Sequence, residues 1–311
     1  MFNKIDFSAH EHGLKAPAIS YGMGPQILNF FRHSKRKLLT GGFAETVYLF
    51  LKDLEKKEGA FHHRDGEYTV NLSFDLELGL NTPFWEGDIK RALAYGQSAH
   101  DNFLHVLSFL QKERILSNVQ IVGALLDENA ATLALFNIAQ REALRSKQEL
   151  FTLSPEHIEI LKSPSIEAGV HGFSHRHFTD LSSQEAHYEM RNAVRTFEGR
   201  MGFSPEFMSF PKNYIAHTDV VQKHGIQRWR ADTQNPLADA EIPLGLWFAP
   251  GVLGAADLHK LLTAIKASRS GFFLHLWGHF TEMDARVFAE LVHVIRSEGW
   301  KFTTVKNYQH F

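Results

Sequence analysis

From residue 68 onward, short apolar segments with the character of β-strands alternate along the chain with longer segments that show helical periodicity. Parallel strands need a crossover connection, which is usually a helix, so this alternation favours a parallel sheet covered by helices. About seven strand-helix units fit this part of the chain, which predicts a (β/α) barrel or a distorted version of one. An open, doubly wound sheet is the alternative.

The predicted elements can be placed by periodicity and by their start and stop signals. The predicted strands span residues 68–75, 119–126, 165–172, 206–211, 226–231, 272–279 and 301–305. The predicted helices span 98–115, a segment around 131–147, 182–202, 217–225, 256–271 and 284–299. The pattern Ser182-x-x-Glu185 is a capping box, and Asp101 is expected in the first turn of its helix.

The composition excludes several classes of protein. The formal net charge of −2 over 311 residues predicts that the chain does not bind nucleic acid. The chain has no cysteine, so disulfides, cysteine zinc ligands and a cysteine nucleophile are excluded. Because no apolar run reaches the length of a signal peptide or a membrane span, we expect a cytoplasmic protein without a membrane span.

Residues 1–67 differ from the rest and are predicted to form a partly helical N-terminal extension to a domain at 68–311. Segment 42–59 carries apolar residues at helical spacing and ends at a glycine after a charged run. The basic run at 32–37 could meet an anionic substrate, although a solvated surface turn is the simpler explanation.

Polar and ionisable residues gather where the predicted strands end. Functional side chains of parallel α/β folds lie just beyond the carboxyl ends of their strands, so these residues predict one site. The strand ends carry Asp75-x-Glu77, His171, Phe210-Pro211-Lys212-Asn213, Arg230-x-Asp232 and His275-x-x-x-His279.

Two of these strand ends together offer the ligands of a metal. Two imidazoles at His171 and His175 are expected on the same face of a helical turn, where both can reach one ion. With the Glu77 carboxylate they make a set suited to zinc or another divalent cation that holds a water, and Asp75 would be the base. Taken singly, the carboxylates could be a solvated strand end and the histidines surface or core residues. His177 lies off the expected face and is assigned a supporting role.

The segment 272–279 offers a general acid. His275 follows three apolar residues, and we expect it at the end of a buried strand, placed to protonate a leaving group. His279 comes four residues later and is expected to share the site. A core histidine bonded to a backbone carbonyl is the alternative for His275.

Four segments in this order and spacing resemble the polysaccharide deacetylases with a NodB homology domain, carbohydrate esterase family 4. The resemblance covers about residues 68–311 and rests on SFDLELG, HGFSHRHF, FMSFPKN and FFLHLWGH. It implies a distorted (β/α)7 barrel, a divalent metal that is usually zinc, and hydrolysis of N- or O-acetyl groups on sugars.

The resemblance also implies roles for individual residues. Asp75 matches the catalytic base, and Glu77 stands where the family has an aspartate ligand, one methylene longer. His171 and His175 match the second motif as the other two ligands. His275 matches the acid, and Trp277 would line the sugar site.

The third motif departs from the family. It normally supplies an arginine that orients the base, but SFPKN has no arginine, so Lys212 or Arg230 would have to replace it. The turn at Pro211 would bring a backbone N–H near Asn213 and Tyr214 to the oxyanion.

These residues predict a metal-dependent hydrolase, most simply with Zn²⁺, that removes an acetyl group from a saccharide. A nucleotide sugar or a lipid-linked sugar of surface-polysaccharide (O-antigen or lipopolysaccharide) biosynthesis is the expected substrate. The alternatives are a carbohydrate-binding or assembly protein that keeps the barrel and metal but has lost turnover, a phosphoesterase with a second metal, and a metal-dependent transferase.

Overall fold

The computed structural model describes residues 66–130, 135–230, 240–242, 246–247, 254–268 and 271–307. The predicted N-terminal extension lies outside these residues except for positions 66 and 67, so its boundary and its helix stay predictions.

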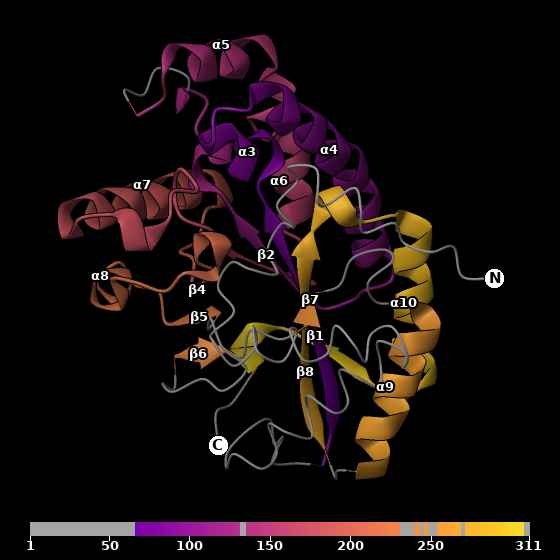
Figure 1. Cartoon of the computed structure of the whole chain (residues 1–311). Coiled ribbons are helices and arrows are strands. Elements are labelled where there is room, and N and C mark those ends of the chain that lie inside the picture. Colours follow the sequence, from indigo (N-terminus) through magenta and orange to yellow (C-terminus); the bar gives the residue numbers. More distant parts are fainter. Residues whose placement is uncertain are drawn as a thin grey trace, which may run out of the picture.

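The centre of the fold is a curled parallel sheet, which confirms the predicted distorted barrel (Figure 1). The strands pair in the order β6-β5-β4-β3-β2-β1-β8-β7, with β9 also beside β1, and every pairing among the described residues is parallel. The strands are β1 (Tyr68–Leu76), β2 (Ser117–Ile121), β3 (Ile166–Val170), β4 (Phe207–Met208), β5 (Arg228–Arg230), β6 (Glu241–Ile242), β7 (Leu246–Trp247), β8 (Phe272–His279) and β9 (Lys301–Thr303).

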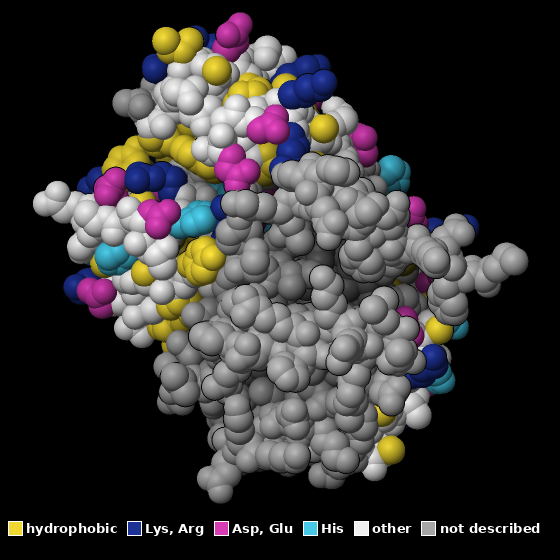
Figure 2. All heavy atoms as spheres, in the orientation of Figure 1, with side chains coloured by type: hydrophobic (Ala, Val, Ile, Leu, Met, Phe, Trp, Pro, Cys, Tyr) yellow, Lys and Arg dark blue, Asp and Glu magenta, His cyan; other side chains and the backbone are white. Residues whose placement is uncertain are grey.

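Helices surround the sheet, with α9 and α10 on one side and α7 and α8 on another (Figure 1). They are α3 (Thr82–Trp85), α4 (Ile89–Lys112), α5 (Ile138–Ser146), α6 (Pro155–Leu161), α7 (Ser183–Met201), α8 (Thr218–Lys223), α9 (Ala255–Ser268) and α10 (Ala285–Ser297). Side chains of both charges and histidines are interspersed over α7 and α8 (Figure 2). None of the helices in the described part of the chain combines the length and the apolar character that a membrane crossing requires.

The predicted helix starts hold for α7 but not for α4. The capping box at Ser182 and Glu185 is present, with each side chain bonded to the other residue's backbone N–H. Helix α4 begins nine residues before the predicted 98, because Asp88 accepts a hydrogen bond from Arg91 N–H and caps it. Asp101 therefore lies in mid-helix and is exposed, and its expected place in the first turn is wrong.

Strand β1 has one apolar face and one polar face, although both are buried. Its apolar residues Val70, Leu72 and Phe74 belong to the main core, and the Phe74 ring stacks on Phe280 with 5.1 Å between centroids. On the other face the residues are Asn71, Ser73 and Asp75. Asn71 Nδ2 donates to Asn118 Oδ1 (2.7 Å) and Thr303 O (2.9 Å), which satisfies its amide nitrogen inside the sheet.

The strand register decides which residues of β8 stand level with Asp75. Asp75 pairs with His279, whereas His275 pairs with Asn71. The expectation that His275 ends the strand is wrong, because the buried strand continues through Leu276, Trp277 and Gly278. At about 3.3 Å per residue, His275 lies about 13 Å below the level of His279 along the strand.

Candidate metal centre and its carboxylate base

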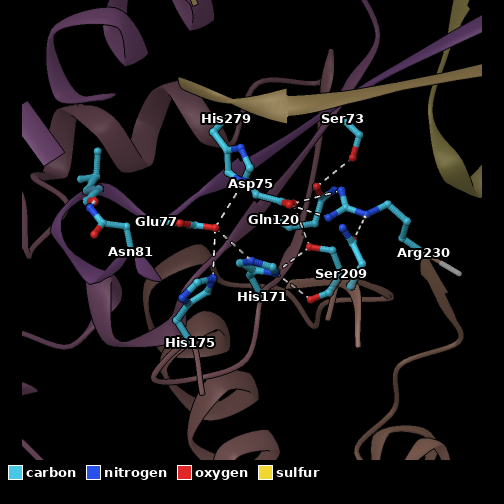
Figure 3. Close-up of polar contacts among 12 residues, drawn as sticks. Ser73, Asp75, Glu77, Asn81, Gln120, His171, His175, Ser209, Arg230 and His279 are labelled. Carbon is cyan, nitrogen blue, oxygen red and sulfur yellow. Dashed lines mark hydrogen bonds and ion pairs between the residues drawn. The ribbon is translucent and has the colours of Figure 1, made fainter. Parts of the chain in front are cut away.

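Glu77, His171 and His175 come together just beyond the carboxyl ends of β1 and β3 (Figure 3). Glu77 Oε1 lies 3.4 Å from His171 Nε2 and 3.0 Å from His175 Nε2. Both imidazoles are buried, and the Glu77 side chain is 14% exposed. Among the residues that the structure describes, this is the one group of three or more such donors with ligand spacing.

The protonation of these groups suits a cation. His171 Nδ1 lies 2.8 Å from the carbonyl oxygen of Ser209, which can only accept, so a neutral His171 imidazole carries its proton on Nδ1 and its lone pair on Nε2. That lone pair faces Glu77. Burial alone would raise the pKa of Glu77, but His175 and His279 hold that pKa well below its usual value. Burial lowers the pKa of His175 and favours its neutral form. A lone pair facing a carboxylate repels it unless a cation lies between them, so these residues fit a metal ion.

The two histidines reach this arrangement through a loop and not through the predicted helical turn. No helix spans 171–175; instead Gly172 has φ +69° and His175 has φ +66°. The chain turns sharply twice between the ligands, once at each of these left-handed residues. Such a backbone conformation is unfavourable for a residue with a Cβ, as at His175. The expectation of an i, i+4 helical face is wrong, but the ring centroids still approach to 4.9 Å.

Asp75 is buried beside this centre and is held by the side chains of Arg230 and Ser209 (Figure 3). Arg230 at the end of β5 donates from Nη1 to Oδ1 (3.2 Å) and from Nη2 to Oδ2 (2.5 Å). Ser209 Oγ donates to Oδ1 (2.9 Å), and exchanging the oxygen and nitrogen of the neighbouring Gln120 amide would bring a third donor to within 3.3 Å of Oδ1. Burial alone would raise the pKa of Asp75, but the Arg230, His171 and His279 charges lower it to about 2. Asp75 is therefore a carboxylate at neutral pH.

Arg230 thus stands where the resemblance called for an arginine. Its Nε donates to Asn213 Oδ1 at 2.7 Å, and its guanidinium lies over the Trp277 ring, 4.7 Å from the centroid. The expectation that Trp277 lines the sugar site is wrong, since the side chain is only 5% exposed and covers Arg230. Lys212 is half-buried at the edge of the site, where burial lowers its pKa against the opposing effect of Glu86, Glu77 and Asp180.

The turn after β4 brings Pro211 to Tyr214 to the same edge of the sheet. Lys212 (φ +56°) and Asn213 (φ +58°) both adopt the left-handed conformation. Asn213 N–H donates to Phe210 O at 2.8 Å and is engaged in the turn, whereas the bond from Tyr214 N–H to Pro211 O is longer, at 3.4 Å. Of the two predicted oxyanion donors, Tyr214 N–H is the better candidate.

His279 and His177 border the centre from different sides. His279 Nε2 lies 3.4 Å from Glu77 Oε1, and its side chain is 23% exposed. The His177 ring lies 5.5 Å from that of Tyr214, and burial and Lys212 lower its pKa to about 4 despite the opposing effect of Asp180. His177 is a neutral neighbour of the turn, in line with the supporting role assigned to it.

The sequence analysis did not assign Ser209 or Gln120 to the site. Ser209 links the two halves of the centre, since its oxygens meet His171 Nδ1 while its hydroxyl donates to Asp75. The alternation of polar and apolar residues in VNLSFD and VQI was a usable signal, because a buried strand with a polar face must supply partners for that face.

Comparison with known proteins gives a family match and a fold match. A family model described as polysaccharide deacetylase matches residues 93–229. No curated protein matches the chain. A structure described as a polysaccharide deacetylase from Mycobacterium smegmatis is similar at 13% identity, with a TM-score of 0.54, over 77% of this chain and 86% of that chain.

Two further solved structures belong to carbohydrate esterase family 4 by their descriptions. One is an enzyme from Streptomyces lividans in complex with acetate (11% identity, TM-score 0.46, 79% of this chain and 97% of that one). The other is a pseudoenzyme from Bacillus anthracis (11% identity, TM-score 0.49, 79% of this chain and 66% of that one). The matched residues 93–229 include His171, His175 and Ser209, while Asp75, Glu77 and Arg230 lie outside them.

Proposed function

We propose that this chain, a relative of the polysaccharide deacetylases by its match over residues 93–229, is a metal-dependent hydrolase that removes an acetyl group from a sugar. One observation carries the proposal. Three donors that fit a divalent cation stand beside a buried carboxylate whose pKa of about 2 keeps it ionised. A metal donor set next to a fixed base is what activation of a water for attack on an acyl group requires.

Glu77, His171 and His175 would hold the ion, and two imidazoles with one carboxylate favour Zn²⁺. When bound, such an ion polarises the acetyl carbonyl and lowers the pKa of a water. The chain's own residues do the rest. Ser209 fixes the His171 ring through Nδ1, so its Nε2 is directed at the centre.

Asp75 is the proposed base. Its two oxygens are oriented by Arg230 and Ser209, so the proton of an attacking water has a defined acceptor. Because the pKa of Asp75 is about 2, the proton does not remain there at neutral pH and passes on to the leaving group or to solvent. Tyr214 N–H is the proposed donor to the oxyanion, which forms on the acetyl carbonyl oxygen when water adds to the carbonyl carbon.

We assign the general acid to His279 in place of His275. His279 is partly exposed and 3.4 Å from Glu77, whereas His275 is buried lower in β8, level with Asn71. A group that protonates the leaving amine or alcohol must reach the substrate side of the centre.

His279→Gln is therefore expected to lower kcat for acetate release by about 10²-fold, while His275→Gln leaves it within about twofold. Steady-state kinetics with metal content measured in each variant makes the comparison. The reverse order of effects would return the acid role to His275. Loss of metal from His279→Gln would instead identify His279 as a further ligand.

The substrate is proposed as an acetylated saccharide. The finer predictions from the sequence, a nucleotide or lipid-linked sugar in surface-polysaccharide biosynthesis and a cytoplasmic location, stay predictions.

The test of the function is acetate release by the full chain. We expect the Zn²⁺-loaded protein to release acetate from N-acetylated or O-acetylated oligosaccharides, and the chelator-treated protein to do so only after Zn²⁺ is restored. A metal-loaded protein that binds these sugars but releases no acetate would favour the carbohydrate-binding alternative. A second metal about 4 Å from the first would favour a phosphoesterase.

A further inference from the structure

Helix α7 carries a carboxylate on its buried apolar face. Glu189 is 1% exposed and lies among Ala186, Met190 and Ala193, which all belong to the core. Burying a carboxylate is strongly unfavourable unless it is hydrogen-bonded or paired. The position of Glu189 therefore needs a reason other than helix packing.

Its partners are the two residues between the candidate metal ligands. Glu189 Oε2 accepts from Phe173 N–H (3.0 Å) and Ser174 N–H (2.9 Å), and Oε1 accepts from Ser174 Oγ (2.5 Å). Both amides can only donate, so the carboxylate is the acceptor in each bond. Charge-assisted bonds of this kind are about twice as strong as neutral ones.

The opposite side of the same loop is held by β2 and the turn after it. Gly123 N–H donates to Gly172 O (2.9 Å) and Ala124 N–H donates to Phe173 O (2.8 Å). The loop thus has the carbonyl groups of Gly172 and Phe173 bonded from one side and the amide groups of Phe173 and Ser174 bonded from the other. Buried backbone groups of an irregular segment need such partners.

The loop needs this support because of its backbone. Gly172 and His175 are both left-handed, and for His175 this conformation is strained, so the surrounding contacts must hold it in place. If the amides of 173 and 174 lost their acceptor, the loop could relax toward ordinary backbone angles. The His175 imidazole would then leave Glu77 Oε1, which is now 3.0 Å from its Nε2.

We propose that Glu189 is a positioning residue that pre-forms the loop 171–175 and so sets the affinity and geometry of the metal centre. This proposal rests on the proposed function in one respect: both concern the same metal centre. Its test measures metal binding and not acetate release.

The test compares Glu189→Gln with the wild type in the full chain. Gln keeps the shape but turns an amide nitrogen toward the loop, so at least one amide donor loses its acceptor. We expect Zn²⁺ affinity, measured by competition with a chelating dye, to fall about 10- to 100-fold, as for other groups that orient ligands. The visible absorption spectrum of the Co²⁺-loaded variant should also change, because the ligand geometry changes. Asn192→Ala on the same helix, which removes a bond to Tyr188 O and touches no part of the loop, should leave both readouts unchanged.

Ser174→Ala removes only the hydroxyl bond and leaves the carboxylate in place, so it decides the matter if Glu189→Gln fails to fold. It should lower affinity by a few-fold, and Ser174→Thr, which restores a hydroxyl, should recover it. Unchanged affinity and an unchanged Co²⁺ spectrum in folded Glu189→Gln, or in Ser174→Ala where the first variant is unfolded, overturn the proposal. A wild type that binds no metal overturns the centre itself, and one that binds metal without releasing acetate overturns only the proposed function.

Discussion

Asp75→Asn is expected to reduce acetate release by about 10³-fold while the metal stays bound, because general base catalysis contributes between about 10² and 10⁴. The substitution keeps the size of the side chain but removes its charge and its capacity to take a proton, so kcat is compared on samples shown to be folded. Asp75 is not among the three candidate ligands Glu77, His171 and His175, so metal content should be unchanged. The measurement is kcat with metal content determined on the same samples.

Asp101→Asn provides the control for removing a carboxylate. Asp101 is exposed on α4, where it accepts from the Gln97 amide (2.8 Å) and lies 3.8 Å from His100 Nδ1, so its loss should leave kcat unchanged. Full activity in Asp75→Asn would remove Asp75 from the base role. Loss of metal in that variant would mean that Asp75 ligates the ion directly.

Much of the fold could be predicted because strand and helix patterns are local. The strand segments at 68–75 and 272–279 and the helix at 182–202 match β1, β8 and α7 closely. Strand ends were less certain where apolar residues continue past a histidine. His275 is an example, since an imidazole fits inside a buried strand as well as at its end, and only the pairing with β1 shows its level.

The site was predictable in its residue types but not in its supports. Glu77, His171 and His175 could be chosen because metal ligands must be of these types and must follow strands. The loop between the histidines was misread as a helical turn, since spacing alone cannot reveal a left-handed residue such as His175. Glu189 and Ser209 act through contacts 15 and 134 residues away in sequence, which no local pattern carries.

The ion pair of Arg230 and Asp75 serves both the proposed catalysis and the stability of the fold. We expect its loss to have the largest effect on the free energy of unfolding. Both side chains are buried, with Arg230 fully so. Arg230→Met keeps most of the volume but leaves the Asp75 carboxylate without its cation. Removing one partner of a buried ion pair costs about 3–5 kcal/mol of unfolding free energy, because the remaining charge is uncompensated. Urea unfolding followed by circular dichroism measures this.

The double variant Asp75→Asn/Arg230→Met tests whether the loss of stability comes from leaving one buried charge without its partner. It should lose less stability than the sum of the two single variants, since neither charge is then left alone. Arg286→Met is the matched control. The Arg286 side chain is 87% exposed and 3.9 Å from Glu290, and such a surface pair is worth at most about 1 kcal/mol. Equal losses of unfolding free energy in Arg230→Met and Arg286→Met would contradict a stabilising buried ion pair between Arg230 and Asp75.

The dependence of this effect on pH has a definite sign. The pKa of Asp75 falls from 3.8 in the unfolded chain to about 2 in the fold, so the pair stabilises the fold fully above about pH 4. Its contribution declines as pH falls from about 4 toward 2, because Asp75 then takes up a proton. In Arg230→Met the burial of Asp75 is no longer opposed by the guanidinium, so the stability difference between wild type and variant should be largest at neutral pH and should shrink as pH falls toward 2. A difference that instead grows on acidification would show that Arg230 stabilises the fold through contacts other than Asp75, such as those with Asn213 and Trp277.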